Sequence, residues 1–132
     1  MTRMRVLVDG MNVVGSRHDR WWRDRRGAMR RLVAALERYE KKTGDDVTVV
    51  LDSRPFDVGE GAVKARFAAG GRNAGDDEIV RIVEGDPAPG TLTVVTSDKQ
   101  LTARVTALGA RVIGSGQFRD RLSAEVGEHR EA

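Results

Sequence analysis

The chain lacks cysteine altogether and has only two histidines among its 132 residues. Without cysteine it can form no disulfide, no thiolate metal site and no thiol nucleophile. The two histidines, His18 and His129, are too few for a metal site built from imidazole groups. Any metal ion that binds to this chain must therefore be held by oxygen ligands.

Long hydrophobic runs are also missing. The longest apolar stretches, at residues 6–8 and 47–51, have the length of a β-strand and are far shorter than a bilayer span. The first residues lead directly into such a stretch, without the apolar segment of a signal peptide. With 39% hydrophobic and 33% charged residues, the composition is that of a soluble globular protein. We therefore expect one cytoplasmic domain over residues 1–132, with no membrane partner.

The sequence does contain a regular alternation of strand-like and helix-like segments. Apolar residues at helical spacing predict helices after the first, third, fourth and fifth of the strand-like runs. Runs that are apolar throughout, rather than alternating, are typical of a sheet covered by helices on both faces. The pattern predicts an α/β fold with a mostly parallel central sheet of about five strands, at residues 5–8, 47–51, 63–67, 92–95 and 111–113.

Aspartates follow several of these strands. Asp9 follows the first strand, Asp52 the second and Asp98 the fourth, while Asp76 and Asp77 stand at the amino end of the helix after the third. Ligands of open parallel sheets bind beyond the carboxyl ends of the strands. Gathered there, carboxylates would repel one another unless a divalent cation neutralised them, and Mg²⁺ or Mn²⁺ suits such oxygen ligands. This chemistry favours metal-assisted attack of water on a phosphodiester.

Each of these residues also has a purely structural interpretation. Asp76 and Asp77 would stabilise a helix amino terminus without any further role. Asp52 could simply initiate a turn. Asn12, just after the first strand, either supports its loop or uses its amide to orient Asp9 or a substrate phosphate.

Asp98 differs from the other aspartates because its neighbours offer an alternative helix cap. Ser97 and Gln100 have the spacing of a capping box, in which the serine hydroxyl accepts from the backbone. We therefore expect Ser97 to cap the following helix. This would leave the Asp98 carboxylate free for a ligand.

Positive charge is concentrated near the N-terminus, although the formal net charge is only +3. Residues 17–42 contain ten basic and four acidic side chains. Arginines with adjacent indoles can bind phosphates and stack on unpaired bases, which indicates an RNA-binding segment. The alternatives are a solvated helix face for the arginines and core packing for one or both tryptophans. The candidate RNA-binding residues are Arg17, Arg20, Arg23, Arg25, Trp21 and Trp22.

Several short motifs together resemble the NYN domains of the YacP-like group, bacterial relatives of the PIN-domain nucleases. The resemblance implies a three-layer PIN-like fold and an endoribonuclease that depends on Mg²⁺ or Mn²⁺. It further implies that Asp9, Asp76 or Asp77, and Asp98 form the acidic site, and that Asn12 is the family's DGxN asparagine. The motifs, in the order and spacing of the family, are at residues 8–15, 50–52, 74–80, 95–98 and 109–110.

Two other functions compete with a nuclease. A phosphoacceptor receiver domain is a βα protein of similar size, but it needs an acidic pair after its first strand, where this chain has only Asp9. An RNA-binding adaptor with a PIN-like fold and no turnover would use the same residues. RNA is the expected partner of both the nuclease and the adaptor. Whether a ribosome or another RNA-processing protein is a further partner, and which oligomer forms, the sequence leaves open.

Overall fold

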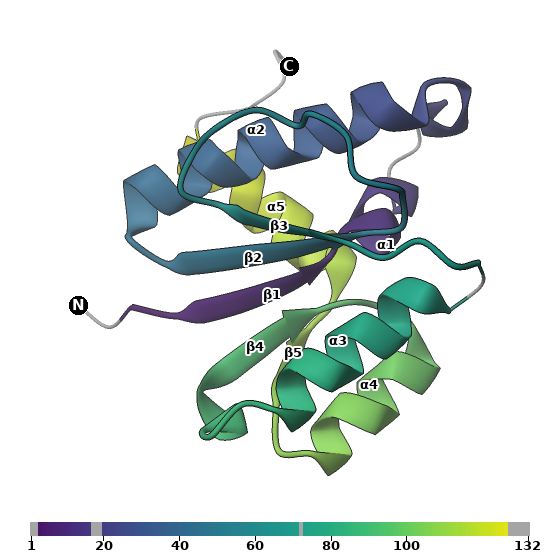
Figure 1. The fold of residues 1–132 in the computed structure, drawn as a ribbon. Helices are drawn as coiled ribbons and strands as arrows, with labels where there is room; N and C mark the ends of the chain where they lie inside the picture. Colours follow the sequence, from purple (N-terminus) through teal and green to yellow (C-terminus); the bar gives the residue numbers. More distant parts are fainter. Residues whose placement is uncertain (1–2, 17–19, 72, 127–132) are drawn as a thin grey trace.

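Five parallel strands form the central sheet in a computed structural model that describes residues 3–16, 20–71 and 73–126 (Figure 1). The predicted strands are confirmed to within a residue or two, and the sheet is parallel throughout. In sequence order, the strands are β1 (Arg5–Asp9), β2 (Asp46–Leu51), β3 (Lys64–Phe67), β4 (Leu92–Val95) and β5 (Arg111–Ile113).

Helices cover both faces of this sheet and complete three layers (Figure 1). One face packs against α1 (Gly10–Gly15), α2 (Arg25–Thr43) and α5 (Ser115–Val126), and the other against α3 (Ala74–Glu84) and α4 (Lys99–Ala107). The chain also forms two short 3-10 helices, η1 (Trp21–Arg23) and η2 (Pro89–Thr91). Within the described ranges, no helix is both long and apolar enough to cross a bilayer.

Successive side chains of β1 point to opposite faces of the sheet and pack against both layers of helices. Val6 and Val8 belong to the core under α1, α2 and α5, whereas Leu7 belongs to the core under α3 and α4. All three are at most 2% exposed. A central strand that is apolar on both faces is what the continuous hydrophobic run predicted.

The strands lie in the order β3-β2-β1-β4-β5, so the direction of winding reverses at β1. Ligand sites of such sheets lie at this switch point, beyond the carboxyl ends of the strands. Receiver domains instead have the order 2-1-3-4-5. The receiver alternative is therefore excluded by the topology.

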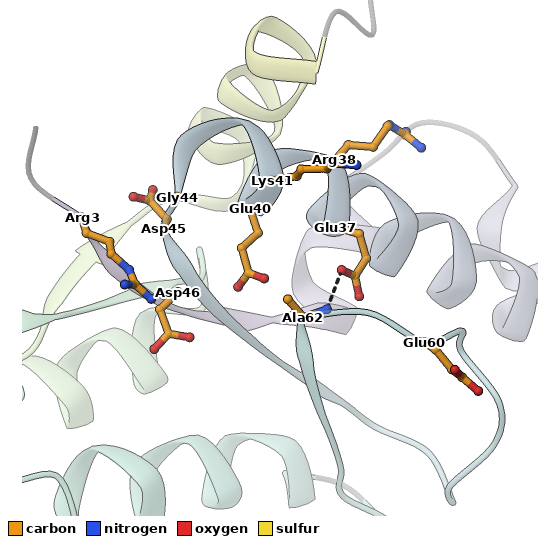
Figure 2. A pocket seen from close by; sticks show the side chains of 10 residues that line it. All are labelled: Arg3, Glu37, Arg38, Glu40, Lys41, Gly44, Asp45, Asp46, Glu60 and Ala62. Atoms are coloured by element: carbon orange, nitrogen blue, oxygen red, sulfur yellow. Dashed lines mark hydrogen bonds between the residues drawn. The ribbon is translucent and has the colours of Figure 1, made fainter.

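The opposite, amino-terminal edge of the sheet holds a hollow of about 670 Å³ (Figure 2). Its acidic side chains are engaged in holding the backbone together. The Glu37 carboxylate accepts from the backbone N–H of Ala62 at 3.0 Å, and Glu40 accepts from Val47 at 2.8 Å. Buried Asp45 accepts from the Tyr39 hydroxyl at 2.8 Å. We therefore assign this hollow a structural role.

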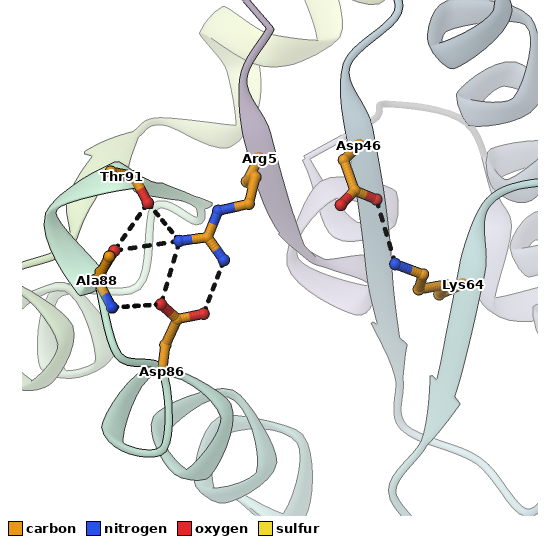
Figure 3. A network of polar contacts seen from close by, with 6 residues as sticks. All are labelled: Arg5, Asp46, Lys64, Asp86, Ala88 and Thr91. Carbon is orange, nitrogen blue, oxygen red and sulfur yellow. Dashed lines mark hydrogen bonds and ion pairs between the residues drawn. The ribbon is translucent and has the colours of Figure 1, made fainter.

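A second polar network at the same edge fixes β1 to the segment between α3 and β4 (Figure 3). The Arg5 guanidinium donates to both oxygens of Asp86, at 2.7 and 3.1 Å, and to the carbonyl of Ala88 at 3.1 Å. Nearby, Lys64 on β3 pairs with Asp46 on β2 at 3.4 Å. These contacts fix the register of the sheet and leave the carboxyl edge for other residues.

Helix α1 was not predicted from the sequence, where Asn12 was placed in a loop after the first strand. Its first residue, Gly10, lies so close to β2 that a Cβ atom would be 2.7 Å from the carbonyl oxygen of Val50 and 2.8 Å from Leu51. Because the first of these neighbours is backbone, it cannot move aside easily. Gly10 is thus needed for the turn from β1 into α1.

We expect Gly10→Ala to lower the free energy of unfolding by about 1–3 kcal/mol, because overpacking at a backbone contact forces the turn to shift. Urea denaturation followed by circular dichroism measures this change. Gly116→Ala is the matched control, since a Cβ there meets no atom within 4 Å. Equal stability of the two variants would contradict the close contact.

Candidate active site

The carboxyl edge of the sheet brings together aspartates from four segments of the chain. Asp9 ends β1, Asp52 follows β2 and Asp98 follows β4, while Asp76 lies in the first turn of α3. Repulsion from Asp52 and Asp76 helps to raise the pKa of Asp9, and repulsion from Asp98 and Asp52 helps to raise that of Asp76. Asp9, Asp52, Asp76 and Asp98, here called the carboxylate cluster, therefore form one electrostatic unit.

Asp9 is the most deeply buried member of the carboxylate cluster, at 6% exposure. Burial raises the pKa of its carboxyl to about 6, and the nearby charges of Asp76 and Asp52 act in the same direction. The Thr96 hydroxyl donates to Asp9 Oδ2 at 2.8 Å and opposes this rise in pKa. Thr96 Oγ1 also accepts from the backbone N–H of Asp98 at 3.1 Å, so it connects Asp9 to the next acidic segment.

The Asp52 side chain packs against the first turn of α3 at Gly75, the residue before Asp76. A Cβ on Gly75 would come within 1.9 Å of Asp52 Oδ1, so only glycine allows this approach. Burial raises the pKa of both carboxyls. Arg25 opposes the rise for Asp52, and its Nη2 donates to the Asp52 backbone carbonyl at 3.5 Å.

The structure separates Asp76 from Asp77, which the sequence could not do. Asp76 is half-buried and interacts with the carboxylate cluster, whereas the side chain of Asp77 is 64% exposed. Asp77 instead pairs with Arg104 on α4 at 3.1 Å. Both residues lie in the first turn of α3, where negative charge favours the helix.

The capping-box prediction for α4 is wrong. The N-cap is Asp98 itself, whose Oδ1 accepts from the backbone N–H of Leu101 at 2.9 Å. The Ser97 hydroxyl instead accepts from the backbone N–H of Ser115 at 2.8 Å. The serine that local spacing assigned to the cap is thus engaged in a tertiary hydrogen bond instead. One Asp98 oxygen is used by the cap, and no described residue donates to the second.

Asn12 lies in the first turns of α1, three residues after Asp9. Its side-chain Oδ1 accepts from the backbone N–H of Ser97 at 2.8 Å and from the Ser115 hydroxyl at 2.5 Å. These two bonds join α1 to the starts of α4 and α5. The Asn12 oxygen thus accepts from the two serines, while the backbone N–H of Asn12 and the Thr96 hydroxyl both oppose the rise in the pKa of Asp9.

The basic segment, described here over residues 20–26, spans η1 and the start of α2, and its two indoles differ in burial. Trp21 is partly buried and packs against the core, whereas Trp22 is 59% exposed. Their rings meet edge to face, with centroids 6.1 Å apart. Arg25 lies over Trp21 at 5.9 Å from the ring centroid, beside Asp52. Core packing thus holds for one tryptophan only.

The candidate arginines on this segment are solvent-exposed where the structure describes them. Arg20, Arg23 and Arg25 are all exposed, and Arg17 lies outside the described residues. Asp24 caps α2 by accepting from the backbone N–H of Gly27 at 3.0 Å. The basic segment is therefore fixed at its junction with the helix, close to the carboxylate cluster.

A divalent cation fits the donor chemistry of the cluster, although its ligands are not gathered into a closed cage. Across the described ranges, no three acidic or histidine side chains converge in a way that would hold a metal ion. Mg²⁺ usually retains several waters and binds through one or two carboxylates, so a closed cage is not required. Burial is the main cause of the raised pKa values of Asp9, Asp52 and Asp76, and repulsion between carboxylates adds to it for Asp9 and Asp76, while Arg25 opposes the rise for Asp52 and Arg104 for Asp76.

Comparison with known proteins agrees with this geometry. The YacP-like NYN domain matches residues 6–132. The chain belongs to the YacP-like NYN domain family. Family membership is consistent with a ribonuclease and with the PIN-like fold of this NYN domain.

Solved structures of similar fold include two of Rae1 (YacP) from Bacillus subtilis. A point mutant aligns with this NYN domain at a TM-score of 0.72 and 21% identity, covering 92% of this chain and 76% of that one. The second structure gives a TM-score of 0.70 at 19% identity, covering 91% and 74%. At this identity, the likeness establishes the fold. No curated protein matches the sequence.

Two residues at the site of this NYN domain were not singled out by sequence reasoning. Thr96 holds Asp9, and Gly75 admits Asp52 to the start of α3. Both lie within the motifs that carry the family resemblance. Gly75 directly precedes Asp76, and Thr96 lies two positions before Asp98. Their closeness to the aspartates in the sequence could have indicated a role at the site, but it does not predict which atoms come into contact.

We expect metal-free protein to lose stability as pH rises, because the pKa of Asp9 is about 6 when folded and 3.8 as its ordinary value. Between these values the unfolded chain is the first to lose the proton, so the free energy of unfolding falls with pH, by about 3 kcal/mol at most. Asp9→Asn removes this loss.

Thermal melting in EDTA from about pH 4 to about pH 7 measures the effect. The melting temperature of Asp9→Asn should rise relative to wild type across this range. Asp77→Asn is the control, because Asp77 is exposed and lies outside the carboxylate cluster. A constant difference between Asp9→Asn and wild type over the range would contradict the raised pKa.

Proposed function

We propose that this protein is a Mg²⁺- or Mn²⁺-dependent endoribonuclease that hydrolyses RNA phosphodiester bonds at the carboxylate cluster. The observation that carries the proposal is the position of buried Asp9 at the switch point of the sheet, at the same edge as Asp52, Asp76 and Asp98 from three other segments; the raised pKa of Asp9 agrees with it. Structural carboxylates are normally paired with cations, whereas functional sites hold perturbed carboxylates together. Membership of the YacP-like NYN family supports the same function.

The candidate metal ligands are Asp9, Asp52, Asp76 and the second oxygen of Asp98, of which an ion that keeps several waters would use one or two. A bound Mg²⁺ or Mn²⁺ would activate a water molecule and neutralise charge on the phosphate. The residues of the chain supply position: Thr96 fixes the Asp9 carboxylate by its hydrogen bond of 2.8 Å. Burial of Asp9 keeps bulk water away from one side of the site.

RNA binding is proposed for the basic segment beside the carboxylate cluster. Arg20, Arg23 and Arg25 are exposed and can contact phosphates. Trp22 offers an exposed indole on which an unpaired base can stack. Arg25 is next to Asp52, so a strand bound along the basic segment would pass the carboxylates.

We expect Asp76→Asn to lower single-turnover cleavage of RNA in Mn²⁺ at least about a hundredfold, because it removes one preorganised charged group. Asp77→Asn is the matched control, one residue along the same helical turn but paired with Arg104. It should cut RNA within about threefold of wild type, since loss of an exposed ion pair matters little.

The same assay separates turnover from plain binding. Equal loss of cleavage in Asp76→Asn and Asp77→Asn would contradict the assignment of Asp76. Wild type that retains labelled RNA in Mn²⁺ without cutting it would favour the RNA-binding adaptor. The use of one Asp98 oxygen as a helix cap is the observation on the adaptor's side.

We expect replacement of Arg20, Arg23 and Arg25 by alanine to weaken RNA binding and to flatten its salt dependence, by about one unit of slope per lost phosphate contact. Fluorescence anisotropy over a range of salt concentrations measures both. Replacement of Lys41 and Lys42, exposed at the far end of α2, is the control. An unchanged slope in the arginine variant would leave these residues as a solvated surface.

A further inference from the structure

The hydrogen bonds around Asn12 decide which side of its amide group is free. The backbone N–H of Ser97 can only donate, so the Asn12 atom that it contacts at 2.8 Å must be the oxygen. The Ser115 hydroxyl donates to the same oxygen at 2.5 Å. Both lone pairs of Oδ1 are then occupied, and the two N–H groups of the amide lie on its other side.

These two serines also hold each other. Ser115 is fully buried, and its backbone N–H donates to the Ser97 hydroxyl at 2.8 Å. Asn12, Ser97 and Ser115 thus form a closed triangle of three hydrogen bonds from three different elements. Such a closed network leaves the Asn12 side chain a single orientation.

The Asn12 amide nitrogen is not used inside the described part of the protein. No described residue accepts a hydrogen bond from Nδ2, and Nδ2 is not among the buried polar atoms that lack a partner. Asn12 lies one helical turn from Asp9, while Ser97 stands between Thr96 and Asp98. Asn12 therefore lies beside the carboxylate cluster with both N–H groups of its amide unpartnered among the described residues.

We propose that Ser97 and Ser115 are positioning residues, which hold Asn12 so that its amide N–H groups donate to the RNA phosphate at the carboxylate cluster. Neutral donors suit this place, because they can bind a phosphate oxygen without neutralising the carboxylates that would hold a divalent cation. The proposal rests on RNA binding at this site, but it does not require cleavage.

A double-mutant cycle on RNA affinity tests the dependence of Ser115 on Asn12. The probe is a short fluorescein-labelled oligouridine in Ca²⁺, a hard cation that can neutralise the carboxylates, and gel electrophoresis confirms that the probe stays intact. Asn12→Ala should weaken binding about tenfold and Ser115→Ala about threefold, as expected for hydrogen bonds to a charged group and for one of its supports. The double variant should bind no more weakly than Asn12→Ala alone.

Three controls keep the result interpretable. Ser123→Ala changes a half-buried serine on the same helix and should bind as wild type does. If Ser115→Ala unfolds, Ser97→Ala replaces it in the cycle and should weaken RNA binding in the same way. In wild type, the Asn12 side-chain amide signal in the ¹H–¹⁵N spectrum should shift when oligouridine is added, and the shift should shrink in Ser115→Ala. A merely structural serine would not change that shift.

Independent, additive losses from Asn12→Ala and Ser115→Ala would overturn the proposal, as would wild-type affinity in Asn12→Ala. Wild type that binds oligouridine in Ca²⁺ but fails to cut RNA in Mn²⁺ would overturn the nuclease and leave the role of Asn12 to be decided by the cycle. Wild type that binds no RNA in either condition would overturn both.

Discussion

Mutual repulsion among carboxylates at one edge of the sheet is the constraint around which the rest of this structure is arranged. Parallel strands direct their carboxyl ends to the same edge, and the order of strands reverses at β1, so Asp9 lies between neighbours on both sides. Burial and repulsion both disfavour its charged form. Bringing these groups together opposes folding, and the surrounding contacts must compensate for that penalty.

The compensation comes from residues that carry no charge. Thr96 donates to Asp9, Gly75 gives Asp52 room against α3, and the backbone of α4 satisfies one oxygen of Asp98. Cationic partners stay at the periphery, where Arg25 approaches Asp52 and Arg104 pairs with Asp77. A site held by neutral donors retains its negative potential and therefore its attraction for a divalent cation.

The strands and the acidic edge were predictable because hydrophobic runs and strand ends are local features of the sequence. The helix at Gly10 was not, because its stability depends on packing against β2 rather than on helix propensity. Local spacing also failed at Ser97, whose hydroxyl is taken by Ser115, eighteen residues away. The choice between Asp76 and Asp77 depended on the position of Arg104, which no spacing in the sequence specifies.

Proton release on Mn²⁺ binding tests most directly whether the carboxylate cluster is a single cation-binding unit. Calorimetric titration in buffers of different ionisation enthalpy measures it. At about pH 6, where the Asp9 carboxyl is partly protonated, binding should release a substantial fraction of a proton, and at about pH 8 almost none. Asp9→Asn should release much less at the lower pH. Mn²⁺ binding with the same proton release at both pH values, or no binding at all, would contradict the account.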